Sequence, residues 1–327
     1  MKSLPADTYV DGVRAGDRAV LARAITLVES EHPRHAALAQ EVLTRLLPST
    51  GRSRRVGISG VPGVGKSTFI DALGMHLVGH GHQVAVLAID PSSSVSGGSI
   101  LGDKTRMSRL AREPAAYIRP SPSSGTLGGV ARKTRETLLL CEAAGFDVVL
   151  VETVGVGQSE TVVADLVDFY LVLMLAGAGD ELQGIKRGIL EVADMVAINK
   201  ADGDNKLAAA QARSQYRAAL HLMRPGAEPV VTTCSAMEGT GIDLLWDSVE
   251  SVIAQREASG ALAQRRTQQQ VGWMWAMVND GLRAALRAHP DVAALVPCLE
   301  QDVREGRATP TSAALQVLGA FLPRTQA

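Results

Sequence analysis

Residues 54–68 read RRVGISGVPGVGKST, and this stretch decides the fold. The segment GVPGVGKS at 60–67 fits the pattern G-x-x-x-x-G-K-[ST] and directly follows an apolar run that predicts a strand. In this pattern the glycines let successive backbone N–H groups face a phosphate, while the following helix directs its positive N-terminus toward it. Chance produces such a match in a chain of this length about one time in a hundred. We therefore predict a phosphate-binding loop between a strand and a helix.

Two side chains of this loop have predicted roles in phosphate chemistry. Lys66 is expected to reach the β- and γ-phosphates of a nucleotide, and Ser67 to place its hydroxyl on Mg²⁺. An accidental glycine-rich turn is the alternative, but the flanking strand and helix are the context that a phosphate-binding loop requires. The predicted nucleotide-binding residues here are Gly60, Gly63, Val64, Gly65, Lys66, Ser67 and Thr68.

The pattern of apolar residues predicts a doubly wound α/β domain with a mostly parallel sheet and helical extensions at both ends. Short apolar runs alternate with amphipathic stretches between residues 54 and 254, which indicates a parallel sheet covered by helices on both faces. We expect an N-terminal helical extension at 1–50, a P-loop domain at 51–256 and a C-terminal helical arm at 257–327. The runs that predict strands are 56–59, 84–89, 148–151, 170–175, 195–198 and 230–233.

The two extensions differ in their predicted helices. Apolar residues recur at helical spacing on both sides of a break at 31–34, which predicts two short helices between residues 11 and 47. The arm from residue 257 is also helical, and two more helical stretches follow a break at His289 and Pro290.

Composition excludes several classes of protein. The 327 residues include 33 Lys and Arg against 34 Asp and Glu, so the formal net charge is -1 and a globally basic nucleic-acid-binding surface is excluded. Aromatic residues make up 3%, too few to favour stacking on single strands. The apolar run 169–178 is about half as long as a bilayer crossing requires. The three cysteines form no C-x-x-C pair. We expect a soluble, cytoplasmic protein without nucleic-acid or membrane partners.

A second motif predicts which base is bound. The sequence NKAD at 199–202 follows an apolar strand, and in N-K-x-D the aspartate accepts hydrogen bonds from N1–H and the exocyclic amine of guanine. Adenine has no such pair of donors, so the motif favours GTP and GDP over ATP. A surface turn can produce these four letters, but their place after a phosphate-binding loop makes that alternative weak. The residues predicted to contact the base are Asn199, Lys200, Asp202, Ser235 and Ala236.

Two carboxylates follow predicted strands. Asp90 directly follows the run 84–89, and Glu152 directly follows the run 148–151. Ligands of open α/β sheets bind beyond the carboxyl ends of strands. The segment ETVG at 152–155 stands where many GTPases carry D-x-x-G, so the N–H of Gly155 is expected to meet the γ-phosphate. Val156 stands where many small GTPases carry a glutamine that orients water. Hydrolysis without a partner is therefore expected to be slow.

Two polar loops are candidate switches. The segment 91–106 is rich in glycine and serine, and its Asp103 is expected to respond to the γ-phosphate. The segment 177–187 carries Lys186 and Arg187, either of which could stabilise transition-state charge. A flexible, solvated loop is the alternative explanation in both cases.

Together these motifs resemble the MeaB/ArgK family, and the resemblance spans nearly the whole chain. Its motifs are more specific than the phosphate-binding loop alone. They stand at 60–67, 90–93, 97–107, 119–122, 152–160 and 199–202.

The resemblance implies a homodimeric GTPase that acts as a chaperone of adenosylcobalamin-dependent methylmalonyl-CoA mutase. Such proteins gate cofactor loading and protect the mutase, which in turn accelerates their GTP hydrolysis. Their C-terminal helices serve dimerisation, which makes Trp273, Trp275 and Met277 candidate interface residues. No cobalamin-binding pattern is visible, so the cobalamin is expected on the partner.

The resemblance also assigns residues to the reaction. The implied catalytic residues are Lys66, Asp90, Asp103, Glu152 and Lys186. The implied residues of the Mg²⁺ site are Ser67, Asp90, Asp103 and Glu152.

Two other functions are considered. A transport-linked amino-acid kinase or ATPase of the ArgK type predicts ATP preference and a second substrate pocket, and Asp202 argues against ATP. A metallochaperone GTPase would explain His76, His80 and His82, but no cysteine accompanies them and the end of a surface helix explains them as well.

Overall fold

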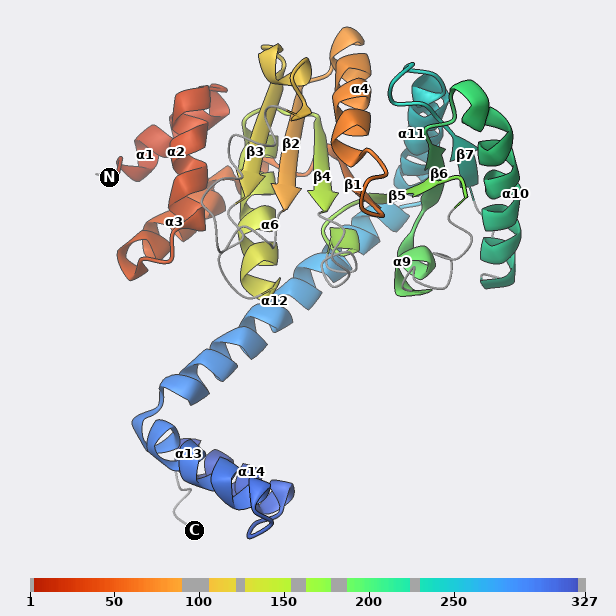
Figure 1. Ribbon diagram of the computed structural model, residues 1–327. Coiled ribbons are helices and arrows are strands. Elements are labelled where there is room, and N and C mark those ends of the chain that lie inside the picture. The colour runs from red at the N-terminus through yellow and green to blue at the C-terminus, as the bar shows by residue number, and fades with distance from the viewer. Residues whose placement is uncertain are drawn as a thin grey trace. The chain divides into compact units, whose positions relative to one another are not determined.

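A seven-stranded sheet forms the centre of the fold, and every strand pair in it is parallel (Figure 1). The computed structural model describes residues 3–89, 106–121, 127–153, 163–177, 187–223 and 230–322. The strand order is β3-β2-β4-β1-β5-β6-β7. The strands are β1 (Arg54–Gly60), β2 (Val84–Ile89), β3 (Ala116–Ser121), β4 (Val148–Thr153), β5 (Phe169–Leu175), β6 (Met195–Asn199) and β7 (Val230–Thr233).

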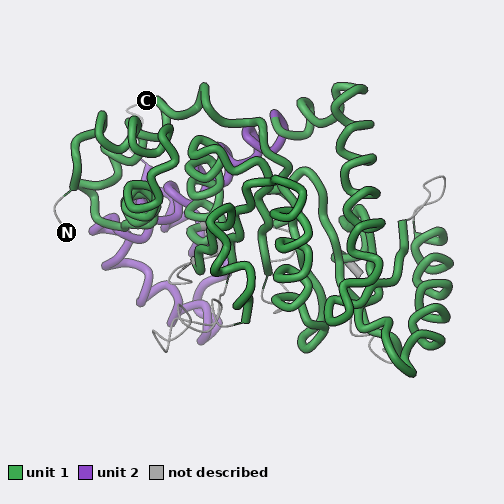
Figure 2. Tube along the Cα trace, turned by 90° about the horizontal axis from the view of Figure 1, so that it is seen from above, with its two compact units in different colours: residues 1–266 green, residues 267–327 purple. Residues whose placement is uncertain are grey.

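The described residues divide into two compact units, 1–266 and 267–327, which Figure 2 shows in green and purple. The α-helices are α1 (Ala6–Arg14), α2 (Arg18–Glu29), α3 (Pro33–Leu46), α4 (Lys66–Gly79), α6 (Leu127–Ala143), α9 (Arg187–Val192), α10 (Lys206–Met223), α11 (Ile242–Ala258), α12 (Ala261–Ala288), α13 (Pro290–Arg304) and α14 (Pro310–Phe321). Single 3₁₀ turns lie at Leu47–Ser49, Leu110–Arg112 and Gly203–Asn205.

The central strands are buried on both faces, as their sequences predict. On β5, Tyr170 and Val172 belong to a core with α6 and α10, whereas Phe169 and Leu171 belong to a core with α4 and α11. Side chains of a strand alternate between its faces, so each strand supplies both cores. The predicted P-loop α/β fold with helical extensions is confirmed.

Strand β3 is a correction to the predicted strand set. Its sequence AYIRPS contains Arg119 and Pro120, which interrupt the apolar run. Proline is accepted in a strand at the edge of a sheet, and β3 is the edge strand that pairs with β2.

The N-terminal region has three helices where two were predicted, because α1 precedes the two expected ones. These helices pack on one another and on α6 (Figure 1). Arg18 of α2 also donates from Nη1 to the carbonyl of Pro114 at 3.1 Å and from Nη2 to that of Ala116 at the β3 edge. The N-terminal extension is therefore part of the first unit.

The second unit contains the rest of α12 together with α13 and α14, and the break at His289 and Pro290 falls where it was predicted. Across the described residues, no helix combines the length and apolar character that a membrane crossing requires.

Candidate nucleotide-binding site

The phosphate-binding loop lies where β1 ends and α4 begins. Gly65 is the N-cap of α4 with φ of 90°, a left-handed conformation that favours glycine. A Cβ atom on Gly60 would lie 2.4 Å from the carbonyl oxygen of Leu173 on β5, so only glycine fits this close approach. The first residue of α4 is Lys66, which places the helix N-terminus directly after the loop.

Lys66 lies across this loop. Its Nζ donates hydrogen bonds to the carbonyl oxygens of Gly60 at 2.9 Å and Val61 at 3.3 Å. The ammonium group is therefore held beside the backbone that is predicted to surround the phosphates. Its neighbours Ser67 and Thr68 lie in the first turn of α4.

Ser67 and Glu152 meet at the carboxyl ends of β1 and β4. The Ser67 Oγ donates to Glu152 Oε1 at 3.0 Å, and Glu152 is buried. Next to them, Thr153 Oγ1 donates to Ser59 Oγ at 2.9 Å. A hydroxyl and a carboxylate are hard oxygen ligands, so this pair fits the predicted Mg²⁺ site.

Asn199 joins the phosphate-binding loop to the base-binding segments. Its Nδ2 donates to the carbonyl oxygen of Val64 at 2.8 Å, and its Oδ1 accepts from the backbone N–H of Ala236 at 3.1 Å. Lys200, which has φ of 59°, donates from Nζ to the carbonyl oxygen of Gly63 at 2.9 Å. The left-handed backbone of Lys200 turns the chain at the end of β6 and directs this stem over the loop.

Asp202 is positioned by the segment that follows β7. Its Oδ2 accepts a hydrogen bond from Ser235 Oγ, which also accepts from the N–H of Glu238 at 3.1 Å. Ser235 is fully buried, so its hydroxyl holds one carboxylate oxygen in a fixed direction. Burial raises the pKa of the neighbouring Cys234 thiol to about 12, so this thiol is neutral. Its Sγ donates to Asn199 Oδ1 at 3.7 Å.

The structure thus brings the described site residues together at the carboxyl ends of the strands. Four predicted residues, Asp90, Asp103, Gly155 and Lys186, lie outside the described residues. The pair of Ser59 and Thr153 was missed by sequence reasoning, although hydroxyl residues at the carboxyl ends of two strands were a signal.

The histidines near the end of α4 have local partners. His80 Nδ1 lies 2.8 Å from the carbonyl oxygen of His76, and His82 Nδ1 lies 2.7 Å from Asp147 Oδ2. Within the described ranges, no group of three or more His, Cys, Asp or Glu side chains is placed to hold a metal ion.

Comparison with known proteins gives consistent results across the chain. Residues 21–291 match the family described as methylmalonyl Co-A mutase-associated GTPase MeaB. GTPase ArgK of Escherichia coli strain K12 is 54% identical over 282 residues, which are 85% of each protein. The mitochondrial methylmalonic aciduria type A homolog of Mus musculus is 47% identical over 331 residues, covering 97% of this chain and 80% of that protein. A crystal structure of an LAO/AO transport system kinase is 42% identical, with a TM-score of 0.79 and 98% of each chain covered.

Proposed function

The chain belongs to the MeaB family of GTPases, and we propose that it is a chaperone of an adenosylcobalamin-dependent acyl-CoA mutase. In this role it gates loading of the cofactor and protects the mutase from inactivation. The observation that carries the proposal is the match of residues 21–291 to GTPases described as mutase-associated. Methylmalonyl-CoA mutase is therefore the partner that we propose first.

The site geometry supports a division of work within GTP binding. Asp202, held by Ser235, accepts from guanine, and Lys200 lies along the base. Lys66 contacts the β- and γ-phosphates as it exchanges its bonds to loop carbonyls for bonds to phosphate oxygens. The products are GDP and phosphate.

Ser67 and Glu152 are the described residues that would hold Mg²⁺, directly or through its waters. When bound, the metal neutralises charge on the β- and γ-phosphates. Asp90 and Asp103 complete this site in the proposal, and Lys186 belongs to a switch beside it. Gly155 donates its N–H to the γ-phosphate.

Slow hydrolysis without a partner is part of the proposal. Val156 has no group that can orient the attacking water, so the partner mutase is proposed to accelerate hydrolysis. Whether the chaperone holds GTP or GDP then depends on the state of the mutase.

A homodimer formed through the second unit is also proposed. Along α12, large apolar side chains recur at helical spacing and are exposed, with Trp275 at 58%. Such an apolar stripe on a solvent-exposed surface is typical of a protein interface. The large apolar side chains of α12 that are exposed are Val271, Met274, Trp275, Met277, Val278 and Leu282.

The test is GTP turnover by the purified protein alone and with the purified mutase. Turnover that rises with mutase concentration supports the chaperone, and unchanged turnover contradicts it. The same assay with ATP, with and without amino acids, tests the transport-kinase alternative that one similar crystal structure suggests. ATP turnover stimulated by an amino acid would favour that alternative.

A further inference from the structure

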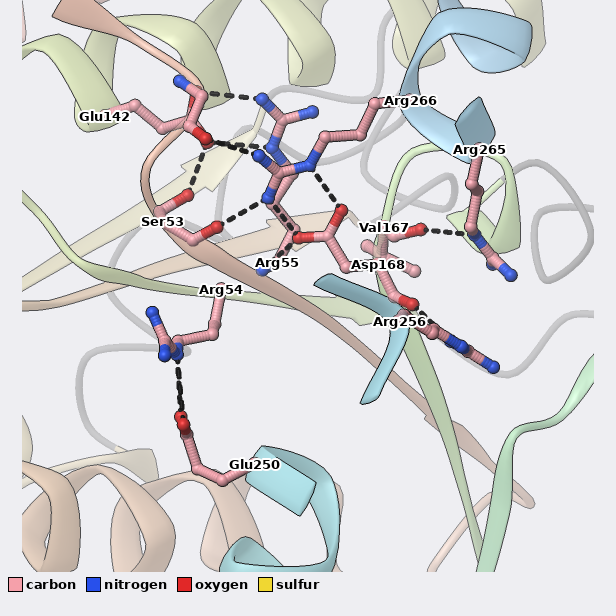
Figure 3. Close-up of polar contacts among 11 residues, drawn as sticks. Ser53, Arg54, Arg55, Glu142, Val167, Asp168, Glu250, Arg256, Arg265 and Arg266 are labelled. Carbon is pink, nitrogen blue, oxygen red and sulfur yellow. Dashed lines mark hydrogen bonds and ion pairs between the residues drawn. The ribbon is translucent and has the colours of Figure 1, made fainter. Parts of the chain in front are cut away.

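A network of buried charges lies at the amino end of the sheet, where β1 and β5 begin (Figure 3). Its centre is Asp168, which immediately precedes β5 and has no exposed surface. Asp168 Oδ2 accepts from the backbone N–H of Arg55 at 2.9 Å and from Arg266 Nη2 at 2.6 Å. Asp168 Oδ1 accepts from Arg266 Nε at 2.8 Å. The guanidinium of α12 and the carboxylate before β5 therefore form a bidentate pair.

Two more arginines hold the backbone that leads into β5. Arg265 donates from Nε to the carbonyl oxygen of Val167 at 3.2 Å and from Nη2 to that of Ala164 at 3.1 Å. Arg256 of α11 donates from Nη1 to the carbonyl oxygen of Asp168 at 2.7 Å. Backbone carbonyls at 164, 167 and 168 are thus bonded to side chains from the end of α11 and the start of α12.

Arg266 also holds the chain that leads into β1. It donates to the carbonyl oxygens of Gly51 and Ser53, the latter from Nη2 at 2.7 Å. Behind these residues, Glu142 of α6 accepts from Arg55 Nε at 2.8 Å and Nη2 at 2.9 Å. The first turns of α12 therefore contact the entries of two neighbouring strands.

Those two strands reach the phosphate-binding loop at their other ends. β1 and β5 are paired from Val56 with Phe169 to Gly60 with Leu173, and Gly60 packs on the Leu173 carbonyl. Backbone pairing holds the two strands in one register, so a displacement of either strand at the loop would be carried along it to the groups that Arg265 and Arg266 bond at the opposite end.

We propose that Arg265 and Arg266 couple the nucleotide state of the phosphate-binding loop to α12, through Asp168 and the strand pair β1 and β5. The proposal rests on guanine nucleotides binding at that loop, and it assigns the first turns of α12 as the output. Hydrogen bonds from a planar guanidinium depend on direction, unlike apolar packing. Relative movement of the strand entries must therefore move the start of α12 or break these bonds. Residues 261–266 belong to the first unit, and the same helix continues into the second.

The test is amide hydrogen exchange of the α12 peptide in the full-length protein, with GDP and with a non-hydrolysable GTP analogue. We expect exchange rates at the start of α12 to differ by about fivefold between the two nucleotides, the lower end of typical coupling between sites. In the Arg266→Gln variant this difference disappears, and in Arg265→Gln, which keeps the bonds of Arg266 to Asp168, it becomes smaller. The affinities for both nucleotides stay within about twofold of the wild type.

Arg54→Gln is the matched control. Arg54 Nε donates to Glu250 Oε1 at 2.8 Å, so it joins the start of β1 to α11 by an ion pair that does not involve α12. Its nucleotide-dependent difference at α12 should equal that of the wild type. Arg266→Gln leaves the buried Asp168 carboxylate without its ion-pair partner, which can prevent folding. If that variant does not fold, Arg265→Gln decides the question.

Two results would overturn the coupling. One is a wild type whose α12 exchanges equally with both nucleotides, and the other is a full difference retained in Arg265→Gln. Stimulation of GTP turnover by the mutase is measured separately, so the chaperone proposal can fail while the coupling holds, and the reverse.

Discussion

Replacing Asp202 by asparagine is expected to exchange guanine preference for xanthine preference. The asparagine oxygen can still accept from Ser235 Oγ, so the local structure should be kept. The variant loses two charge-assisted hydrogen bonds to guanine, each contributing about 1.5–3 kcal/mol. The sum of about 3–6 kcal/mol corresponds to a loss of roughly 10²–10⁴-fold in GDP affinity. Xanthine carries an oxygen where guanine has the amine, and the asparagine NH₂ can donate to it.

The assay is calorimetric titration of wild type and variant with GDP and with XDP. Asp204→Asn is the control, because Asp204 lies two residues away in the same 3₁₀ region, is exposed and has no proposed contact with the base. The control should bind GDP as the wild type does. The reasoning would be refuted by an Asp202→Asn protein that binds GDP within about threefold of the wild type, since this is less than one charged hydrogen bond contributes.

Three further changes test other parts of the structure. Gly60→Ala should lower GDP affinity at least about tenfold and cost up to about 3 kcal/mol of stability, because its Cβ would lie 2.4 Å from the Leu173 carbonyl oxygen. An unchanged GDP affinity in calorimetric titration and an unchanged thermal unfolding temperature would contradict this. Burial raises the pKa of Glu142, but the hydrogen bonds and charge of Arg55 outweigh it and hold that pKa below the ordinary 4.5. The pair therefore stabilises the folded state above pH 4.5, and Glu142→Gln should cost about 3–5 kcal/mol in urea unfolding at neutral pH, a difference that shrinks as the pH falls below 4.5. Trp275→Ser should weaken the proposed dimer by about 2 kcal/mol, or roughly thirtyfold, in sedimentation equilibrium; an unchanged association constant would exclude Trp275 from the interface.

The strands that carry the site could be predicted because they are continuous apolar runs. The segment 148–151, for example, consists of valine and leucine and is buried throughout as part of β4. β3 escaped prediction because Arg119 and Pro120 divide its apolar residues, and only pairing with β2 makes the segment a strand. Helix α1 has nine residues, so it offers few turns in which helical spacing can be recognised.

Some features of the candidate site could likewise be predicted from the sequence, and others could not. The residue types of the phosphate and guanine motifs could be predicted because each motif is local in sequence. The bond between Asn199 and Val64 could not, since 135 positions separate the two residues and only the sheet brings them together. Asp168 and Arg266 likewise look like ordinary charged residues in the sequence, and the ion pair that joins buried Asp168 to half-buried Arg266 depends on the fold. The roles of Asp90, Asp103, Gly155 and Lys186 stay predictions.

The amide of Asn199 has a consequence for which ligands fit the site. One short side chain spans from the carbonyl of Val64 to the N–H of Ala236, so the distance between the phosphate-binding loop and the base-binding segment is fixed by the length of a single amide. The site therefore selects ligands by the distance between their base and their phosphates. A molecule with the right base but too many or too few atoms between base and phosphate can satisfy one end only.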